Sequence, residues 1–540
     1  MFDIIILMAS KAVTKNGMAG LPFLTLMLGV LMRLCVSLHH YSGERQPPMF
    51  GDYEAQRHWM EITTNLPLQE WYYNTTENDL LYWGLDYPPL TAYHSLLCGY
   101  VASFINPDFI TLGVSRGYES TEHKFFMRST VLIADLFVYI PAIWWFFCKT
   151  KQYTKGNDSK KREISEVQTS EEANELPVKL MFLALIYPGL ILIDHGHFQY
   201  NGISLGLMVA AVAALCEGRD LIGSVLFTLS LNYKQMELYH ALPFFCYLLG
   251  NCFPKENQSL TACCRRFLSL GFIVIITFIA VWFPFFRDIN VVLQVVHRLF
   301  PLARGVFEDK VSNIWCCINV FYKFKNTFTN VQMAKLCLIA TLLAVLPTSI
   351  DMVRRPKINK LVISLINSSL AFFLFSFQVH EKSILLAAIP VALYFPLDPF
   401  PCFWFLFIST FSMLPLILKD GLLIPYISLT IFYCFSVYAS VDVRSKTLSP
   451  LQGNRVREST EKSTETHFLK KCVTLLFYAS LLGCVLLTVG SVVLKPPARY
   501  PDLFPLLISV YSCVHFMAFF IYFSYRQIFT MNKCVKSKYK

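Results

Sequence analysis

Apolar stretches long enough to cross a membrane, or nearly so, recur along almost the whole 540-residue chain. A helix that crosses a bilayer perpendicularly needs about 20 apolar residues, and several of these stretches are shorter than that. We predict about 14 membrane spans, and therefore an all-α polytopic membrane protein. The predicted spans are 21–39, 125–148, 179–194, 201–216, 220–232, 241–253, 266–286, 335–351, 361–378, 383–397, 401–418, 421–441, 471–491 and 503–523.

The composition agrees with this class. Only 15% of the residues are charged and 55% are hydrophobic, whereas soluble domains average about 25% charged residues. The net charge of +11 indicates basic loops beside a membrane, and we expect no nucleic-acid partner. The 17 cysteines show neither CxxC nor Cys/His spacing, so we expect buried thiols, no metal and no cofactor.

Loops rich in Lys and Arg predict the orientation of the chain. If the N-terminus is cytosolic, all of them fall on the cytosolic side, as the positive-inside rule requires. The stretches 90–105 and 314–321 then do not cross, and we expect amphipathic helices on the membrane surface. The sequence leaves open whether 90–105 spans. The basic loops are 149–162, 255–266, 352–360 and 444–471.

Both termini are expected in the cytosol. The C-terminal sequence KSKYK resembles the KxKxx retrieval signal of the endoplasmic reticulum, and an ordinary basic tail is an equal alternative. We predict a multi-pass protein of that membrane with a lumenal active site. Its expected segments are a cytosolic N-terminus 1–20, a catalytic helical module 21–286 with a lumenal loop 40–124, a lumenal active-site loop 287–334, a C-terminal helical module 335–530 and a cytosolic tail 531–540.

The first lumenal loop carries the richest polar chemistry, with carboxylates among many aromatic residues. Aromatic faces stack on sugars and carboxylates act as bases on hydroxyls, so we predict sugar chemistry at a membrane surface. Asp52 is our candidate base, with a helix cap or an ion pair with Arg57 as alternatives. We expect Glu54, Asp86 and Tyr87 to contact substrate, although a turn before a proline is the alternative for Asp86.

Other unusual polar residues converge on the same predicted face. We expect His195, His197 and Gln199 to contact substrate, since a metal set is disfavoured by two histidines that diverge on a helix. Glu308 and Asp309 are further substrate candidates, with a self-neutralising surface cluster as the alternative. The sequon at Asn74 lies in the predicted lumenal loop and is a candidate for glycosylation.

A sugar carried on a polyprenyl phosphate explains this combination. The chain has no glycine-rich phosphate loop and no DxD motif in a soluble domain, as a nucleotide sugar would need. A lipid phosphate needs cations at the membrane surface, and the candidates are Arg304, Lys310, His380 and Lys382. Because the leaving group is a phosphate, the essential protein group is one base for the acceptor hydroxyl.

Several long motifs resemble those of the GT-C glycosyltransferases, which are multispanning enzymes with a catalytic carboxylate in the first lumenal loop. Within that superfamily they are most similar to the glucosyltransferase family of the endoplasmic reticulum that adds the first glucose to the dolichol-linked oligosaccharide. The resemblance is strong from about Tyr41 to Lys382 and weaker towards the C-terminus. The motifs are GDYEAQRHW, YWGLDYPPLTAYHS, SRGYES, LIDHGHFQYN, NYKQMELYHA, RLFPLARGVFEDKVSNIWC and FLFSFQVHEKS.

The resemblance implies a substrate pair and roles for particular residues. The implied donor is dolichyl-phosphate glucose, the implied acceptor is dolichyl-diphosphate-linked Man9GlcNAc2, and the product is an α-1,3-linked glucose formed with inversion. It implies that Asp52 is the general base, that His380 contacts the donor phosphate and that Asp86 shapes the sugar site. No metal is implied. Lipids of the endoplasmic-reticulum membrane would surround the enzyme, and protein partners are unknown.

Three alternatives stay open, and one of them is a non-catalytic subunit of a membrane complex. The sister enzyme, which adds the second glucose, shares the architecture and the first-loop Asp. A lipid or solute transporter would also place charges within many helices, but it predicts polar residues at mid-span and inverted repeats. Here the polar motifs cluster at one set of helix ends and no repeat is evident.

Overall fold

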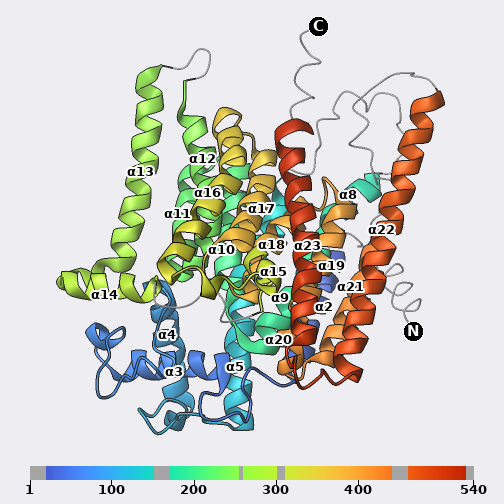
Figure 1. Cartoon of the computed structure of the whole chain (residues 1–540). Helices are drawn as coiled ribbons and strands as arrows, with labels where there is room; N and C mark the ends of the chain where they lie inside the picture. The colour runs from blue at the N-terminus through green and yellow to red at the C-terminus, as the bar shows by residue number, and fades with distance from the viewer. Residues whose placement is uncertain (1–19, 151–169, 255–258, 301–309, 441–459, 531–540) are drawn as a thin grey trace. The chain divides into compact units, whose positions relative to one another are not determined.

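The computed structural model describes residues 20–150, 170–254, 259–300, 310–440 and 460–530, and every regular element within these ranges is a helix (Figure 1). The helices belong to two compact units. The first unit comprises Met1–Gln235, Leu268–Pro301 and Lys419–Ser436, and the second comprises Met236–Phe267, Leu302–Leu418 and Val437–Lys540.

The first unit contains the N-terminal helices and the long loop that follows the first of them. Short π-helical turns interrupt its longer helices, as at η3 (Asp135–Tyr139), η4 (Trp145–Lys149) and η5 (Leu192–Phe198). Its α-helices are α2 (Gly20–Ser37), α3 (Gly51–Asn65), α4 (Pro89–Ile105), α5 (Thr121–Ala134), α6 (Ile140–Trp144), α8 (Ser170–Leu185), α9 (Pro188–Ile191), α10 (Asn201–Cys216), α11 (Asp220–Tyr233), α14 (Ile289–Leu299) and most of α21 (Leu423–Ser440).

The second unit contains most of the C-terminal half of the chain. The boundary between the units passes through α13 (Leu260–Trp282). The other helices of the second unit are α12 (Leu238–Cys252), α15 (Ile314–Phe321), α16 (Asn330–Arg354), α17 (Ile358–Phe375), α18 (Leu385–Tyr394), α19 (Pro399–Ser412), α20 (Leu414–Lys419), α22 (Thr460–Val493) and α23 (Leu503–Tyr525).

Among the described residues, nine helical segments are long and apolar enough to cross a membrane. The prediction of an all-α polytopic protein is therefore confirmed. The other predicted spans fall on the shorter helices α10, α11, α12, α18, α19 and α20, so the count of 14 is not confirmed. The nine segments are Gly20–Ser37, Thr121–Lys149, Glu175–Phe198, Leu260–Arg287, Asn330–Arg354, Ile358–Phe375, Leu423–Ser440, Lys471–Val493 and Leu503–Thr530.

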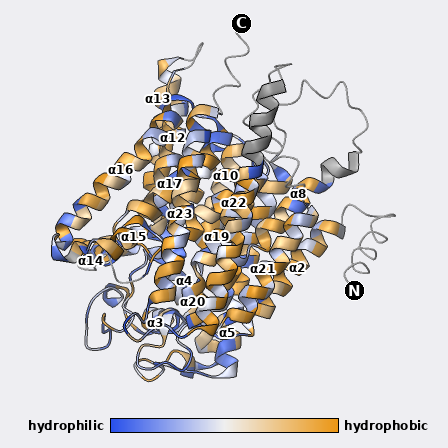
Figure 2. Cartoon of the chain, turned by 45° about the vertical axis from the view of Figure 1, so that its right-hand side comes forward, coloured by the Kyte–Doolittle hydropathy of each residue, from blue (hydrophilic) through white to orange (hydrophobic). Residues whose placement is uncertain are grey.

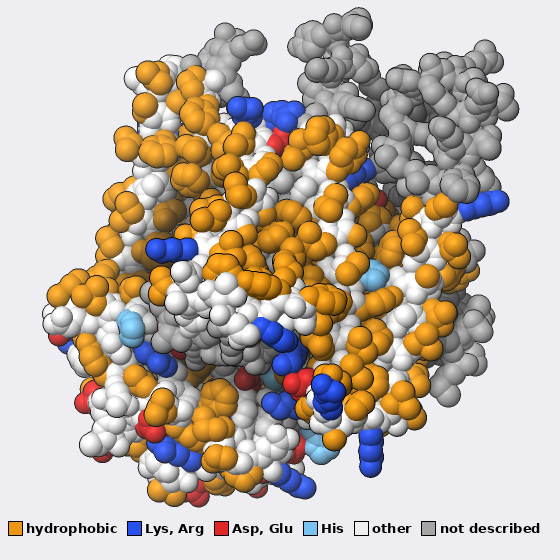
Figure 3. All heavy atoms as spheres, in the orientation of Figure 1, with side chains coloured by type: hydrophobic (Ala, Val, Ile, Leu, Met, Phe, Trp, Pro, Cys, Tyr) orange, Lys and Arg blue, Asp and Glu red, His pale blue; other side chains and the backbone are white. Residues whose placement is uncertain are grey.

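Hydrophobic residues predominate along the long helices (Figure 2). Only 17% of the 18-residue apolar stretch within Leu260–Arg287 is buried inside the protein, and the same share is buried in Lys471–Val493. Figure 3 shows these two helices, α13 and α22, coated with hydrophobic side chains. In a membrane protein such an apolar surface suits contact with the hydrocarbon core of the bilayer.

Polar side chains cap the N-termini of several apolar helices. Ser120 accepts a hydrogen bond from the His123 backbone N–H at the start of α5, and Asn313 caps α15 through the Cys316 N–H. Thr329 and Gln332 form a reciprocal capping box at the start of α16. These side chains satisfy backbone donors that the helix itself leaves unpaired.

The two stretches expected on the membrane surface are helices. α4 buries Thr91, Ser95 and Cys98 on one face and exposes Leu97 and Phe104. Its position relative to the bilayer stays a prediction. α15 covers the shorter stretch.

Helix α14 follows the lower end of α13 and lies crosswise to it (Figure 1). It buries Val291, Val295 and Leu299 against the aromatic residues of the first loop and exposes Ile289 and Leu293. This packing joins the first loop to the segment that follows α13.

Candidate active site

Asp52 lies in the first turn of α3, and a glycine fixes its position. Gly51 has a φ of 74°, and a Cβ atom there would lie 2.7 Å from the carbonyl carbon of Ser42, so only glycine fits. The N-cap position is occupied by Phe50, so the cap alternative for Asp52 is wrong. The backbone N–H of Asp52 donates to Ser42 Oγ at 3.3 Å, and the helix dipole favours a negative charge here.

Arg57 forms a buried ion-pair network within α3 instead of serving the candidate base. Its Nε and Nη2 atoms donate to both carboxylate oxygens of Glu54, at 2.8 and 2.6 Å, and Nη2 also donates to Glu61 at 2.6 Å. Tyr82 donates to Glu54 Oε1 at 2.8 Å. Glu54 is 1% exposed, so a substrate contact would require breaking this pair, and its role in this geometry is to hold α3 in place.

The same network fixes the following loop on α3. Arg57 Nη1 donates to Ser115 Oγ at 2.5 Å, and the Gly113 N–H donates to Glu61 Oε1 at 2.7 Å. Burial opposes ionisation of Glu61, but the hydrogen bond from His58 and the charge of Arg57 outweigh it and lower its pKa to about 2. The SRGYES motif, which begins at Ser115, therefore anchors this loop to α3.

The two histidines of the DHGHFQYN motif diverge, as expected, because the motif begins in the π-helical turn η5. His195 is buried and lies 3.0 Å from Asp135 Oδ2. Asp135 also pairs with Arg33 at 2.6 Å. His197 points elsewhere, with Nε2 at 3.0 Å from Asp52 Oδ2. One motif therefore contacts the buried Arg33–Asp135 ion pair through His195 and the candidate base Asp52 through His197.

Two further residues, Gln199 and Asp420, belong to the surroundings of Asp52 and His197. Gln199 Nε2 donates to Asp52 Oδ2 at 2.5 Å, so one carboxylate oxygen contacts both His197 and Gln199. On its other side, His197 Nδ1 lies 2.5 Å from Asp420 Oδ2. Sequence reasoning missed Asp420, although the predicted topology puts positions 419 and 420 on the lumenal face. Within the described ranges, no group of three or more His, Cys, Asp or Glu side chains is arranged to hold a metal ion.

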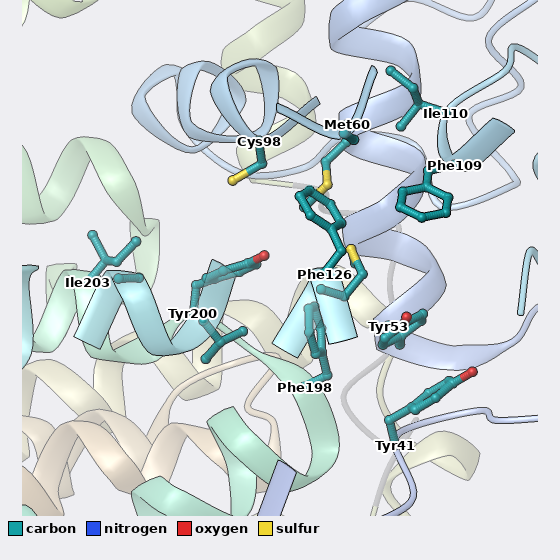
Figure 4. Packing of buried hydrophobic residues seen from close by; sticks show 14 of the residues in the cluster. Tyr41, Tyr53, Met60, Cys98, Phe109, Ile110, Phe126, Phe198, Tyr200 and Ile203 are labelled. Carbon is teal, nitrogen blue, oxygen red and sulfur yellow. The ribbon is translucent and has the colours of Figure 1, made fainter. Parts of the chain in front are cut away.

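Aromatic packing holds α3 against η5 (Figure 4). Tyr41 stacks on Tyr53 with ring centroids 3.9 Å apart, and Tyr53 meets the edge of Phe198 at 4.9 Å. Phe198 separates His197 from Gln199 and adopts a φ of 91°, which is strained for a large side chain. The packed ring therefore holds the backbone bend that aims both neighbours at Asp52.

A small cleft, with room for about one water molecule, is linked to Asp52 through Gln199. Gln199 connects the two, because its Nε2 contacts Asp52 while its side chain lines the cleft. Its Oε1 atom is buried without a hydrogen-bond partner among the described residues. At this size the cleft does not hold a sugar ring, although amide groups and aromatic rings are the kinds of group that contact sugars. The lining residues are Gln56, Tyr87, Thr91, Gln199, Tyr200, Tyr233 and Lys234.

Lys234 supplies a cation to this cleft. Its Nζ donates to Asn201 Oδ1 at 2.6 Å and lies 5.0 Å from the ring centroid of Tyr87. Asn201 in turn donates to Asp194 at 2.7 Å. Sequence reasoning had singled out the NYKQMELYH motif without assigning Lys234 to the site. The backbone carbonyl of Asp86 accepts from Gln235 Nε2 at 2.9 Å, and each of these residues is next in sequence to a residue that lines the cleft.

The candidate phosphate ligands that the structure describes belong to the second unit. His380 and Lys382 belong to the second unit, between α17 and α18, where His380 is exposed and Lys382 is half-buried. Lys310, also in the second unit, pairs with Asp502 at 3.3 Å. Arg304, Glu308 and Asp309 lie outside the described residues, as does the KSKYK tail.

Asn74 is exposed in the first loop, and its side-chain oxygen accepts from the Leu80 N–H at 3.1 Å.

Comparison with known proteins decides the family. The model of the ALG6, ALG8 glycosyltransferase family matches residues 29–522. The chain belongs to this family. A chicken (Gallus gallus) member, named dolichyl pyrophosphate Man9GlcNAc2 alpha-1,3-glucosyltransferase, is 48% identical over 94% of this chain and 96% of its own length. A mouse (Mus musculus) member of the same name is 48% identical over 92% and 94%.

A more distant member comes from Dictyostelium discoideum. It is named as a probable enzyme of the same kind and is 45% identical over 93% of this chain and 94% of its own length. The shared family makes this chain a multi-pass glycosyltransferase, and the resemblance seen in the motifs is confirmed.

Proposed function

We propose that this chain transfers glucose from dolichyl-phosphate glucose to dolichyl-diphosphate-linked Man9GlcNAc2, forming an α-1,3 linkage with inversion. The relatives that align with nearly the whole chain carry the name of this α-1,3-glucosyltransferase. The single structural observation that supports the chemistry is Asp52, held by His197 and Gln199 beside a cleft lined with amides and aromatic rings.

In this proposal Asp52 takes the proton from the 3-hydroxyl of the terminal mannose. The hydroxyl oxygen attacks the anomeric carbon of glucose, and the bond from that carbon to the phosphate oxygen breaks with its electron pair on the phosphate. Gln199 and Tyr87 contact the sugar, and Lys234 contributes positive charge. A positioned base accelerates such a step by about 10²–10⁴-fold.

The donor phosphate needs cations at the membrane surface. We assign this role to His380 and Lys382, with Arg304 as a third candidate, because charged hydrogen bonds to phosphate are strong. The proposed site is lumenal and both termini are cytosolic, in agreement with the positive-inside rule. The exposed sequon at Asn74 suits a lumenal first loop. Endoplasmic-reticulum membrane lipids are the proposed surroundings.

Transfer assays with purified protein in detergent test this proposal. Dolichyl-phosphate glucose is the donor, and the acceptors are the unglucosylated and the monoglucosylated oligomannose lipids, assayed separately. We expect transfer to the unglucosylated lipid alone. Transfer only to the monoglucosylated lipid would identify the enzyme for the second glucose. Absence of transfer to both from folded protein would contradict the glucosyltransferase proposal and favour a transporter.

A further inference from the structure

The imidazole of His197 lies between two carboxylates from distant parts of the chain. Its Nε2 is 3.0 Å from Asp52 Oδ2 and its Nδ1 is 2.5 Å from Asp420 Oδ2. His197 is 2% exposed and Asp420 is 6% exposed, so solvent does not replace either partner readily. The His197 carbonyl is also held, by the Ser42 N–H at 3.0 Å. Both the ring and the backbone of His197 are therefore fixed.

The hydrogen-bond geometry limits how protons can be arranged between these three groups. A carboxylate can only accept hydrogen bonds, and a neutral imidazole can donate from only one ring nitrogen. With both carboxylates ionised, both ring nitrogens must donate, so His197 is an imidazolium. A neutral imidazole protonated at Nδ1 would instead turn its Nε2 lone pair towards Asp52, which disfavours the ionised form of that carboxylate.

We propose that Asp420 is a positioning residue, which acts through His197 to keep Asp52 ionised and oriented for the acceptor hydroxyl. This inference rests on the proposed function of Asp52 as a general base. Asp420 holds the Nδ1 proton, and the second proton of the imidazolium is directed at Asp52 Oδ2. When Asp52 takes the acceptor proton, the ring keeps both of its protons and the carboxyl group stays in place.

Among the residues that the structure describes, the other charged groups near His197 make different contacts. From α5, Arg128 donates to the carbonyl oxygens of Gly196 and His40, at 2.8 and 3.0 Å. His195 faces away and pairs with Asp135. Gln199 is neutral and contacts Asp52 directly. Arg128 adds positive charge on the backbone side of η5, so a second carboxylate is needed to favour an imidazolium beside it.

The decisive variants are Asp420→Asn and His197→Gln. Glutamine keeps a donor for Asp52 but carries no charge, so His197→Gln separates hydrogen bonding from charge. For Asp420→Asn we expect kcat to fall about 10- to 100-fold, less than for loss of the base itself, with KM for both substrates nearly unchanged. The acidic limb of the pH–rate profile should move to higher pH by about one unit, since Asp52 loses a cationic neighbour.

The matched control is Asp398→Asn in the second unit. Asp398 is also a buried carboxylate, paired with Arg526 at 3.4 Å, so its loss perturbs stability in a comparable way. We expect this variant to keep the wild-type pH profile. In the double variant of positions 197 and 420, we expect little further loss beyond His197→Gln alone, because the two residues act through one contact.

Nitrogen-15 spectra of histidine-labelled protein in lipid give a readout that does not need activity. We expect one imidazolium signal near neutral pH that disappears in His197→Gln and turns neutral in Asp420→Asn. A neutral His197 in the wild type, or an unchanged pH profile in Asp420→Asn, would overturn the inference. If the wild type transfers no glucose, the proposed function fails, and the spectra still decide the state of His197.

Discussion

Gln199 Nε2 lies 2.5 Å from Asp52 Oδ2, although 147 residues separate the two in the chain. The contact ties the start of α3 to the bend after η5. It also makes one amide serve both the carboxylate and the neighbouring cleft. The position of the base and the shape of the cleft therefore depend on the same side chain.

Replacing Asp52 by Asn keeps the shape of the side chain and removes the proton acceptor. We expect kcat to fall at least ~100-fold, the lower end for a general base, with donor binding retained. Initial rates and donor binding in detergent measure this. Glu77→Gln, which removes an exposed carboxylate from the same loop, should have wild-type rates. Near-normal turnover of Asp52→Asn would exclude Asp52 as the base.

Arg57→Met should destabilise the first loop. The change leaves the buried carboxylates of Glu54 and Glu61 without their cation, and breaking a buried pair in this way costs about 3–5 kcal/mol. The thermal midpoint in detergent measures the loss. Arg116→Met is the control, because Arg116 is exposed and only stacks on Tyr82. Equal midpoints for the two variants would argue against this role of Arg57.

The pH dependence of stability should reflect the ionisation of Glu61. Burial disfavours its charged form, but His58 and Arg57 lower its pKa from an ordinary 4.5 to about 2 in the folded state. A carboxyl group whose pKa is lower in the folded state stabilises the protein fully at pH values above its pKa in the unfolded state. That stabilisation is lost as the pH falls from 4.5 towards 2. Thermal midpoints should therefore fall over this range in the wild type, and less steeply in Glu61→Gln.

Loss of the sequon at Asn74 should remove one glycan. The side chain is exposed, so a lumenal first loop would present it for modification. We expect Asn74→Gln to increase electrophoretic mobility in protein made in eukaryotic cells, and endoglycosidase treatment of the wild type to produce the same shift. Identical mobility with and without the sequon would weaken the proposed lumenal position.

His380→Ala should act on the donor. Loss of a charged hydrogen bond to phosphate costs about 1.5–3 kcal/mol, so KM for dolichyl-phosphate glucose should rise at least about tenfold. We expect the KM for the acceptor to stay near the wild-type value. A rise confined to the acceptor KM would move His380 to the other substrate.

The sequence predicted the helical membrane class because long apolar runs by themselves indicate membrane-spanning helices. It also located the motifs around Asp52, but it did not separate residues that hold the loop from residues that face the cleft. Glu54 and Ser115 lie in such motifs and are both bound by Arg57. Whether a carboxylate in a motif meets substrate or a neighbouring guanidinium depends on packing, which residue types and spacing do not reveal.

Asp420 illustrates the other limit. It is a lone carboxylate between apolar stretches, and its partner His197 is 223 residues away. No local pattern joins the two positions. The predicted topology put them on the same face, but choosing that pair among the many polar residues there required coordinates.

The π-helical turn η5 makes the length of the segment Leu192–Phe198 unusually important. His195 reaches Asp135 and His197 reaches Asp52 from one seven-residue turn. A π turn contains one residue more than the matching stretch of α-helix, so deleting a single residue would rotate everything beyond it by about 100°. We expect this segment to tolerate no change in its number of residues.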